Sequence, residues 1–303
     1  MFQRSSYKSM KNYYGMKIRF VTDSGSDIDF DYAEKIGVKV VPLSVTFSDA
    51  DDVDYFEDKN FDVKAYYNKY TTDVDFSAKT AQPNPGAFFN AYQELVDKGA
   101  KEIIVVTLSS GLSATINSAR LGANMLKKKN DSIKIHLVDA LNASYSEVFL
   151  VEEGIRLRDE GKSGDEIANL LRDQTKNIKT YILLPSLKYL RKSGRISVTK
   201  YILGRLLKKR PITIVNSEGK NEVATTVTET DEGIHKIIEL TTENFSRFPK
   251  QVTIIHGNNL ERAKLMEEAV KKHIKSAKIN IKCTGVTISA HTGPDVVALI
   301  SEF

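Results

Sequence analysis

Short apolar runs rich in valine and isoleucine alternate along this chain with longer stretches that carry apolar residues at helical spacing. This alternation of strands and helices predicts a parallel sheet covered by helices on both faces. In the first half, the apolar runs lie at 18–21, 38–47, 102–108 and 133–139, and the helical spacing at 85–99, 113–129, about 144–160 and about 163–178.

The second half predicts a different mixture of elements. Residues 212–227 read as a β-hairpin that turns at 218–221. Further helices are expected at about 230–246 and 259–276, and further strands at 252–257 and 279–289. We therefore predict an α/β fold of two domains, the first with a mostly parallel, doubly wound sheet. Gly161 and Gly164 favour a division into residues 16–162 and 163–303, preceded by a flexible extension over 1–15.

Composition narrows the class of protein. Of the 303 residues, 41% are hydrophobic and 27% charged, which is typical of a globular protein. The single cysteine, Cys283, allows no internal disulfide, and no apolar run reaches the length that spans a membrane. The N-terminal residues lack the apolar core of a secretory signal. We therefore expect a cytoplasmic protein.

Charge is distributed unevenly along the chain. Residues 174–217 contain eleven Lys and Arg and no acidic residue, whereas residues 23–75 are strongly acidic. The asymmetry indicates either an oriented interaction surface or two solvated faces. Because the basic stretch has few interleaved aromatic residues and no DNA-binding motif, we expect no nucleic-acid partner.

Loops rich in hydroxyls and glycine follow the predicted strands or precede helices. In open α/β sheets, ligands bind beyond the carboxyl ends of the strands. Hydroxyl groups and the free N–H groups of a helix N-terminus together bind anions, although Ser and Thr also serve there simply as caps and turn formers. The loops are 22–27, 79–86, 107–115, which contains Ser109, Ser110 and Gly111, and 291–294.

The motifs leave the nature of the anion open. No phosphate-binding GxxxxGK[ST] or GxGxxG follows a strand. A serine hydrolase that uses Asp23, one of Ser109, Ser110 and Ser113, and His291 is an alternative, but the loop lacks the GxSxG pattern. No histidine spacing predicts a metal site, and Val53 occupies a position that a calcium loop requires for a ligand.

Four ordered motifs, found from Met16 almost to the end of the chain, resemble those of the DegV family. They are TDSGSD, KTAQPNPGAF, TLSSGLSATINSA, and LRKSGRIS followed by HTGP. The resemblance implies two α/β domains with a long-chain fatty acid held between and within them. It also implies a lipid-binding protein that is not itself an enzyme, needs no cofactor, and in several members is the fatty-acid-binding subunit of a bacterial fatty acid kinase.

The same motifs identify the residues of this chain that correspond to the family's binding site. By resemblance, the fatty acid carboxylate is held by Thr80, Ser109, Ser110 and Gly111, with Ser24 and His291 nearby, and Arg191 and Arg195 lie on the surface that faces a partner kinase. The basic, amphipathic stretch 197–210 predicts either a lid that contacts an anionic membrane surface or an ordinary surface helix.

Overall fold

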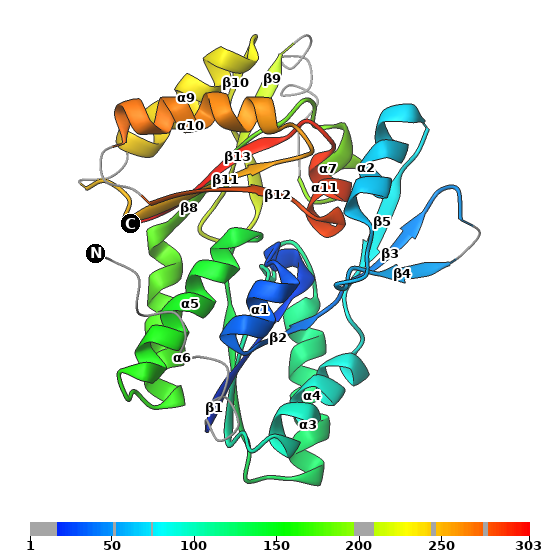
Figure 1. The fold of residues 1–303 in the computed structure, drawn as a ribbon, viewed down its shortest axis with the longest axis vertical. Helices are drawn as coiled ribbons and strands as arrows, with labels where there is room; N and C mark the ends of the chain where they lie inside the picture. Colours follow the sequence, from blue (N-terminus) through cyan, green and yellow to red (C-terminus); the bar gives the residue numbers. More distant parts are fainter. Residues whose placement is uncertain (1–16, 51–52, 74, 197–208, 244–246, 275–277) are drawn as a thin grey trace.

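The computed structural model describes residues 17–50, 53–73, 75–196, 209–243, 247–274 and 278–303. The chain forms a lower and an upper α/β half, with a small arm at the side (Figure 1). The predicted extension over 1–15 lies outside the described residues, and so does the stretch 197–208 of the predicted lid. The membrane contact of that segment therefore stays a prediction.

The first sheet is parallel throughout and is covered on both faces, as the sequence predicts. Alternate residues of one strand serve the two faces: Phe20 packs with one helical layer and Val21 with the other. The strand order is β2 (Val38–Val41), β1 (Ile18–Asp23), β6 (Glu102–Thr107) and β7 (Lys134–Asp139). The helices are α1 (Phe30–Ile36), α5 (Tyr145–Asp159) and α6 (Gly164–Gln174) on one face, and α3 (Pro85–Asp97) and α4 (Thr115–Lys129) on the other.

The second sheet is mixed. Its strands β11 and β12 are parallel, while the other neighbours pair antiparallel, including the predicted hairpin β9–β10. One face packs against helices α9 (Thr230–Glu243) and α10 (Leu260–His273). The order is β10 (Asn221–Val227), β9 (Arg210–Val215), β8 (Ile178–Leu183), β13 (Val297–Glu302), β11 (Gln251–His256) and β12 (Lys278–Cys283).

Helix α5 lies between the two sheets (Figure 1). Residues 145–151 are buried without interruption, so the helix has no solvated face in this stretch. One hydrophobic cluster joins the first sheet, α5 and the inner face of the second sheet through Phe20, Phe149 and Ile300. Because α6 also packs on β7, the packing of the first half continues to residue 174. The division after residue 162 stays a prediction.

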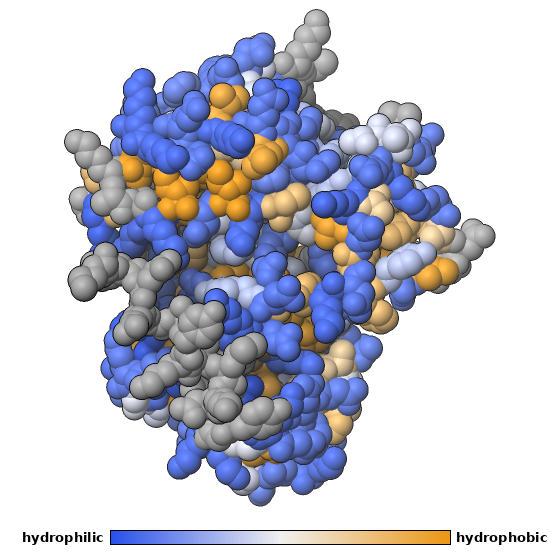
Figure 2. Space-filling view, viewed as in Figure 1, coloured by the Kyte–Doolittle hydropathy of each residue, from blue (hydrophilic) through white to orange (hydrophobic). Residues whose placement is uncertain are grey.

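The arm is a three-stranded antiparallel sheet that the sequence pattern did not predict. Its order is β4 (Asp54–Phe56), β3 (Ser44–Phe47) and β5 (Ala78–Ala81), and helix α2 (Val63–Thr72) packs on it. The apolar run 38–47 was predicted as one strand, but it divides at Pro42, which has no N–H for a ladder. Tyr55 and Phe56 stay exposed, and Figure 2 shows apolar surface on the arm.

Two predictions near the C-terminus were wrong. The predicted strand 279–289 ends at Cys283, and helix α11 (Val286–Thr292) follows it. The carboxylate of Glu57, far away in sequence, accepts hydrogen bonds from the backbone N–H groups of Val286 and Thr287, and so stabilises the start of this helix. The motif HTGP therefore spans the end of this helix, with His291 and Thr292 in its last turn, and the last strand is the fully buried β13, which we had not predicted.

Candidate functional site

A mostly apolar cavity lies between the inner face of the second sheet and the loops at the carboxyl ends of the first. The cavity and its mouth together hold about 840 Å³ of space unoccupied by protein atoms. Val296, directly before β13, and Ala298 and Ile300 on that strand line one wall of the cavity, a span of roughly 13 Å at ~3.3 Å per residue. Leu108 and Leu112, which flank the serine–glycine loop, face it from the first half. The part of this space that the centre of a water-sized sphere can occupy is about 80 Å³.

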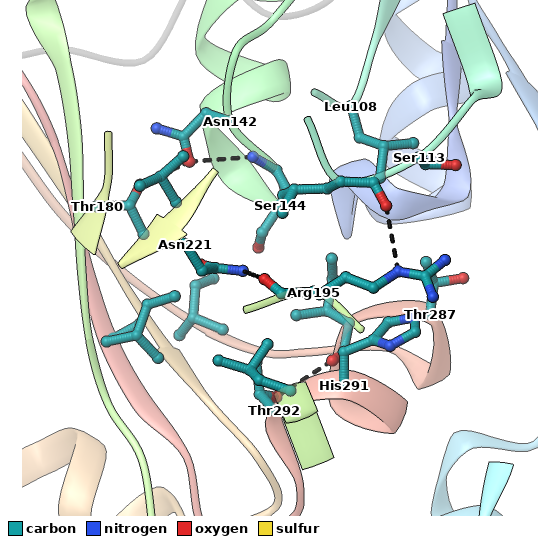
Figure 3. A pocket seen from close by; sticks show the side chains of 18 of the residues that line it. Leu108, Ser113, Asn142, Ser144, Thr180, Arg195, Asn221, Thr287, His291 and Thr292 are labelled. Carbon is teal, nitrogen blue, oxygen red and sulfur yellow. Dashed lines mark hydrogen bonds between the residues drawn. The ribbon is translucent and has the colours of Figure 1, made fainter. Parts of the chain in front are cut away.

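One end of the cavity is polar and combines residues from three parts of the chain. Thr80 comes from β5 of the arm, Arg195 follows helix α7 (Lys188–Lys192), and His291 lies on α11. The Thr80 Oγ1 and His291 Nε2 atoms are 2.8 Å apart. Figure 3 shows Arg195 and His291 side by side at this end of the pocket, and Asn142 with Thr180 at the other.

The Thr80–His291 pair can supply a hydrogen-bond donor to a third group. Burial, aided by the charge of Arg195, lowers the pKa of His291 to about 4, so the imidazole is neutral at pH 7. If Thr80 donates to Nε2, the proton of the neutral ring resides on Nδ1, which has no protein partner among the described residues. If Nε2 donates instead, the Thr80 hydroxyl proton is free. Either arrangement leaves one donor for an anion, without a fixed charge on the imidazole.

Arg195 supplies the positive charge at this end. Its Nε donates to the Leu112 carbonyl oxygen at 3.2 Å, and its guanidinium also donates to the Ser193 carbonyl. It forms no ion pair with any carboxylate of the described residues. An unpaired guanidinium beside a Thr–His pair attracts a carboxylate.

The opposite end of the cavity contains polar residues that the sequence analysis missed. The Thr180 hydroxyl donates to Asn142 Oδ1 at 2.9 Å, and Ser144 lies nearby on the wall. Asn142 and Ser144 follow strand β7, so the rule that examines strand ends would have identified them. Thr180 lies within β8, and no pattern in its neighbourhood indicates a site.

In the serine–glycine loop, Leu108, Leu112 and Ser113 line the cavity, whereas Ser109 and Gly111 contact the tip of the β9–β10 hairpin. The buried Ser109 hydroxyl donates to the Gly219 carbonyl at 2.8 Å and accepts from the Gly111 N–H at 3.0 Å. Gly219 has φ +73°, and a Cβ there would lie 1.9 Å from Ser109 Oγ. Ser110 is exposed, and its N–H donates to Asp139. The loop thus joins the two halves of the molecule.

Of the other predicted residues, some line the cavity and some lie outside it. Ser24 is buried beneath α11, where its hydroxyl accepts from the Leu43 N–H at 3.0 Å and lies beside Glu57. Arg191 is exposed on α7, unlike Arg195. The structure therefore brings together Thr80, His291 and Arg195, and places Ser24, Ser109, Ser110 and Gly111 outside the cavity lining.

Two buried carboxylates from the first half position α11, and with it His291. Asp27 accepts from the Gly285 N–H at 2.8 Å and from the Thr284 hydroxyl at 2.9 Å, beside the contacts of Glu57. Burial raises the pKa of Asp27 to about 6 and, with the nearby charge of Asp27, that of Glu57 to about 8. The helix is thus held by groups that gain protons on folding near neutral pH.

This arrangement predicts that the protein loses stability as the pH rises. The pKa of Glu57 in the folded protein, about 8, exceeds its ordinary value of 4.5. The contribution of Glu57 to the free energy of unfolding is therefore complete below pH 4.5 and is lost as the pH rises through about 8. Glu57→Gln, which resembles the protonated carboxyl, should reduce the fall in unfolding free energy between about pH 5.5 and pH 7.5 by about 2–3 kcal/mol. Urea unfolding at a series of pH values measures this. The exposed Glu268→Gln is the control, and an unchanged slope in Glu57→Gln would contradict the account.

The structure does not bring together the serine, histidine and aspartate of the hydrolase alternative. Among the described residues, no serine of the loop bonds to His291, whose Nε2 contacts Thr80, and Ser113 contacts Thr115. The Asp23 carboxylate accepts hydrogen bonds from the N–H groups of Gly25 and Leu108 and does not orient His291. Nor do the described residues contain a group of three or more His, Cys, Asp or Glu side chains that could hold a metal.

Comparison with known proteins decides the family. The model of a family described as "Uncharacterised protein, DegV family" matches residues 17–303. The chain belongs to the DegV family. A DegV domain-containing protein of Staphylococcus aureus, SA1258, is 31% identical over 283 residues, which cover 92% of this chain and 96% of the relative. The Clostridium acetobutylicum DegV domain-containing protein CA_C1624 is 28% identical and covers 94% and 98%.

Solved DegV structures share the whole fold. DegV of Bacillus subtilis, described as a fatty acid binding protein, has a TM-score of 0.82 at 26% identity and covers 95% of this chain and 100% of its own. A DegV lipid binding protein from Thermotoga maritima has a TM-score of 0.82 at 25% identity, covering 95% and 99%. The Streptococcus pneumoniae Fatty Acid Kinase (Fak) B3 protein loaded with linoleic acid, at 22% identity, a TM-score of 0.80 and coverage of 95% and 99%, supports the fold alone.

The described part of this DegV chain contains no helix with the length and apolar character needed to cross a bilayer.

Proposed function

We propose that this DegV protein binds a long-chain fatty acid and does no covalent chemistry on it. The tail occupies the cavity over β13, and the carboxylate lies at Thr80, His291 and Arg195. The observation that carries the proposal is the pairing of an apolar cavity with one polar end whose donors include an unpaired Arg195 and a neutral Thr–His pair.

The energetics favour a long apolar tail. Each buried methylene contributes ~0.8 kcal/mol, so an acyl chain gains on the order of 10 kcal/mol before the costs of ordering it. A buried carboxylate is costly unless it is hydrogen-bonded, and the polar end offers those bonds. The tail therefore supplies affinity, and the polar end supplies orientation.

We extend the proposal to a partner. The bound acid is presented to a fatty acid kinase, which holds the nucleotide and phosphorylates the carboxylate. Support comes from the DegV membership, from the similarity to the S. pneumoniae Fatty Acid Kinase (Fak) B3 protein, and from Arg191, which is exposed on α7. Ser109, Ser110 and Gly111 support the site indirectly, because their loop positions Leu108 and Leu112 on the cavity wall.

The test is direct loading of the purified protein. After delipidation and incubation with palmitate, native mass spectrometry should show one acid per chain. A fluorophosphonate probe should label none of Ser109, Ser110 and Ser113, because none of these three is hydrogen-bonded to a histidine. A protein that binds no fatty acid would refute the proposal, and stoichiometric labelling of Ser109, Ser110 or Ser113 would favour the hydrolase.

A further inference from the structure

A second, charged cleft adjoins the polar end of the apolar cavity. It lies between the arm and helix α7, and Thr80, Arg195 and His291 line both spaces. A carboxylate held by these three residues therefore lies at the boundary, with its tail on one side and the charged cleft on the other.

The cleft carries an excess of positive charge. Four cationic side chains line it, Lys79, Lys188, Lys192 and Arg195, against the two carboxylates of Asp73 and Asp75. None of the four cations forms an ion pair with a carboxylate of the described residues. Asp73 accepts a hydrogen bond from the Asp75 N–H at 2.9 Å, so part of the opposing charge is engaged within its own turn.

Two of these cations are placed together by helical geometry. Lys188 and Lys192 are four residues apart on α7, so they lie on one side of the helix, and both are exposed. Lys79, one residue before Thr80 on β5, also lines the cleft. Two elements thus bring ammonium groups to a space that begins where a bound carboxylate would end.

We propose that this cleft binds the phosphoryl group of an acyl phosphate formed on the bound fatty acid. The inference rests on the proposed function. In the reaction, a carboxylate oxygen attacks the γ-phosphorus of a nucleoside triphosphate supplied by the partner, and the bond from that phosphorus to the β–γ bridging oxygen breaks. The nucleoside diphosphate leaves with the electron pair, and the mixed anhydride stays on this protein.

The charge of the product explains why lysines are useful there. The carboxylate carries one negative charge, whereas the acyl phosphate carries about two, on oxygens that extend beyond the carbonyl. Lys79, Lys188 and Lys192 line the charged cleft but not the apolar cavity, so they stabilise the acyl phosphate more than the acid. They bind a phosphate as point charges, with little demand on geometry.

A stable analogue tests this without the kinase. (2-Oxoheptadecyl)phosphonate keeps the palmitoyl carbonyl and places a phosphonate where the phosphoryl group would be, and 2-heptadecanone is the same molecule without the phosphonate. We expect the double variant Lys188→Ala/Lys192→Ala to bind the phosphonate about tenfold more weakly than the wild type, and palmitate and 2-heptadecanone within about twofold. Added salt should weaken the binding of the phosphonate to the wild type. It should weaken the binding of the phosphonate to the double variant much less.

Lys264→Ala, which removes an exposed lysine from α10, is the matched control and should change none of these affinities. Phosphonate binding that is unaffected by the double substitution, or a loss shared equally by all three ligands, would overturn the phosphoryl site while palmitate binding upholds the proposed function. Failure of the wild type to bind palmitate would instead overturn the proposed function itself.

Discussion

Ala298→Phe should remove most of the preference of this protein for palmitate over decanoate. Ala298 lies midway along one wall of the cavity, between Val296 and Ile300, and its side chain faces the cavity. A phenyl ring there would occupy the space that a long tail needs beyond its middle. In the wild type, the six additional methylenes of palmitate contribute roughly 5 kcal/mol before ordering costs. We expect the ratio of palmitate to decanoate affinity, measured by calorimetry, to fall at least about 100-fold.

The comparison of two chain lengths separates blocking from unfolding. A misfolded variant would lose both ligands, whereas a shortened cavity still accepts decanoate. Ala298→Ser changes the volume little and should retain the preference of the wild type for palmitate. Unimpaired palmitate binding by Ala298→Phe would place the tail somewhere other than over β13.

Thr80→Val should weaken palmitate binding about 10- to 100-fold. Valine has nearly the shape of threonine but cannot hydrogen-bond, so the variant loses the Thr80–His291 contact that orients the imidazole and its donor toward the carboxylate. Methyl palmitate, which lacks the charge, should bind the variant and the wild type to similar extents. Thr80→Ser retains the hydroxyl and should restore most of the affinity for palmitate.

Thr46→Val is the matched control for this change. Thr46 lies on the neighbouring strand β3, and its hydroxyl donates to Asp54 at the surface of the arm, away from the cavity. Its substitution should leave palmitate binding unchanged. If Thr80→Val weakened the binding of methyl palmitate as much as the binding of palmitate, the Thr80 hydroxyl would stabilise the arm and would not bind the carboxylate.

The local pattern of apolar and polar residues was sufficient to predict most of the helices and strands and the first sheet. Buried β1 and β6 appear as apolar runs because helices cover both faces, and α3 begins where Asn84 caps it and Pro85 follows. These features depend on neighbours within a few residues. Hence the parallel sheet and its covering helices could be predicted.

Contacts between distant residues determined what the pattern missed. Helix α11 begins where Glu57, 229 residues from its partner Val286, accepts a backbone hydrogen bond, and no local signal reveals that contact. The serine–glycine loop has the composition of an anion site, but Gly219, 110 residues from Ser109, uses its hydroxyl. Thr80 and His291 were predicted to lie near each other only through the resemblance, because they belong to different halves of the sequence.

A crystal structure of the protein loaded with palmitate tests the central claim most directly. We predict an acyl chain along Val296, Ala298 and Ile300, with the carboxylate within hydrogen-bonding distance of Thr80 or His291 and beside Arg195. A carboxylate bound at the opposite end, against Asn142 and Thr180, or a chain lying outside this cavity would contradict it.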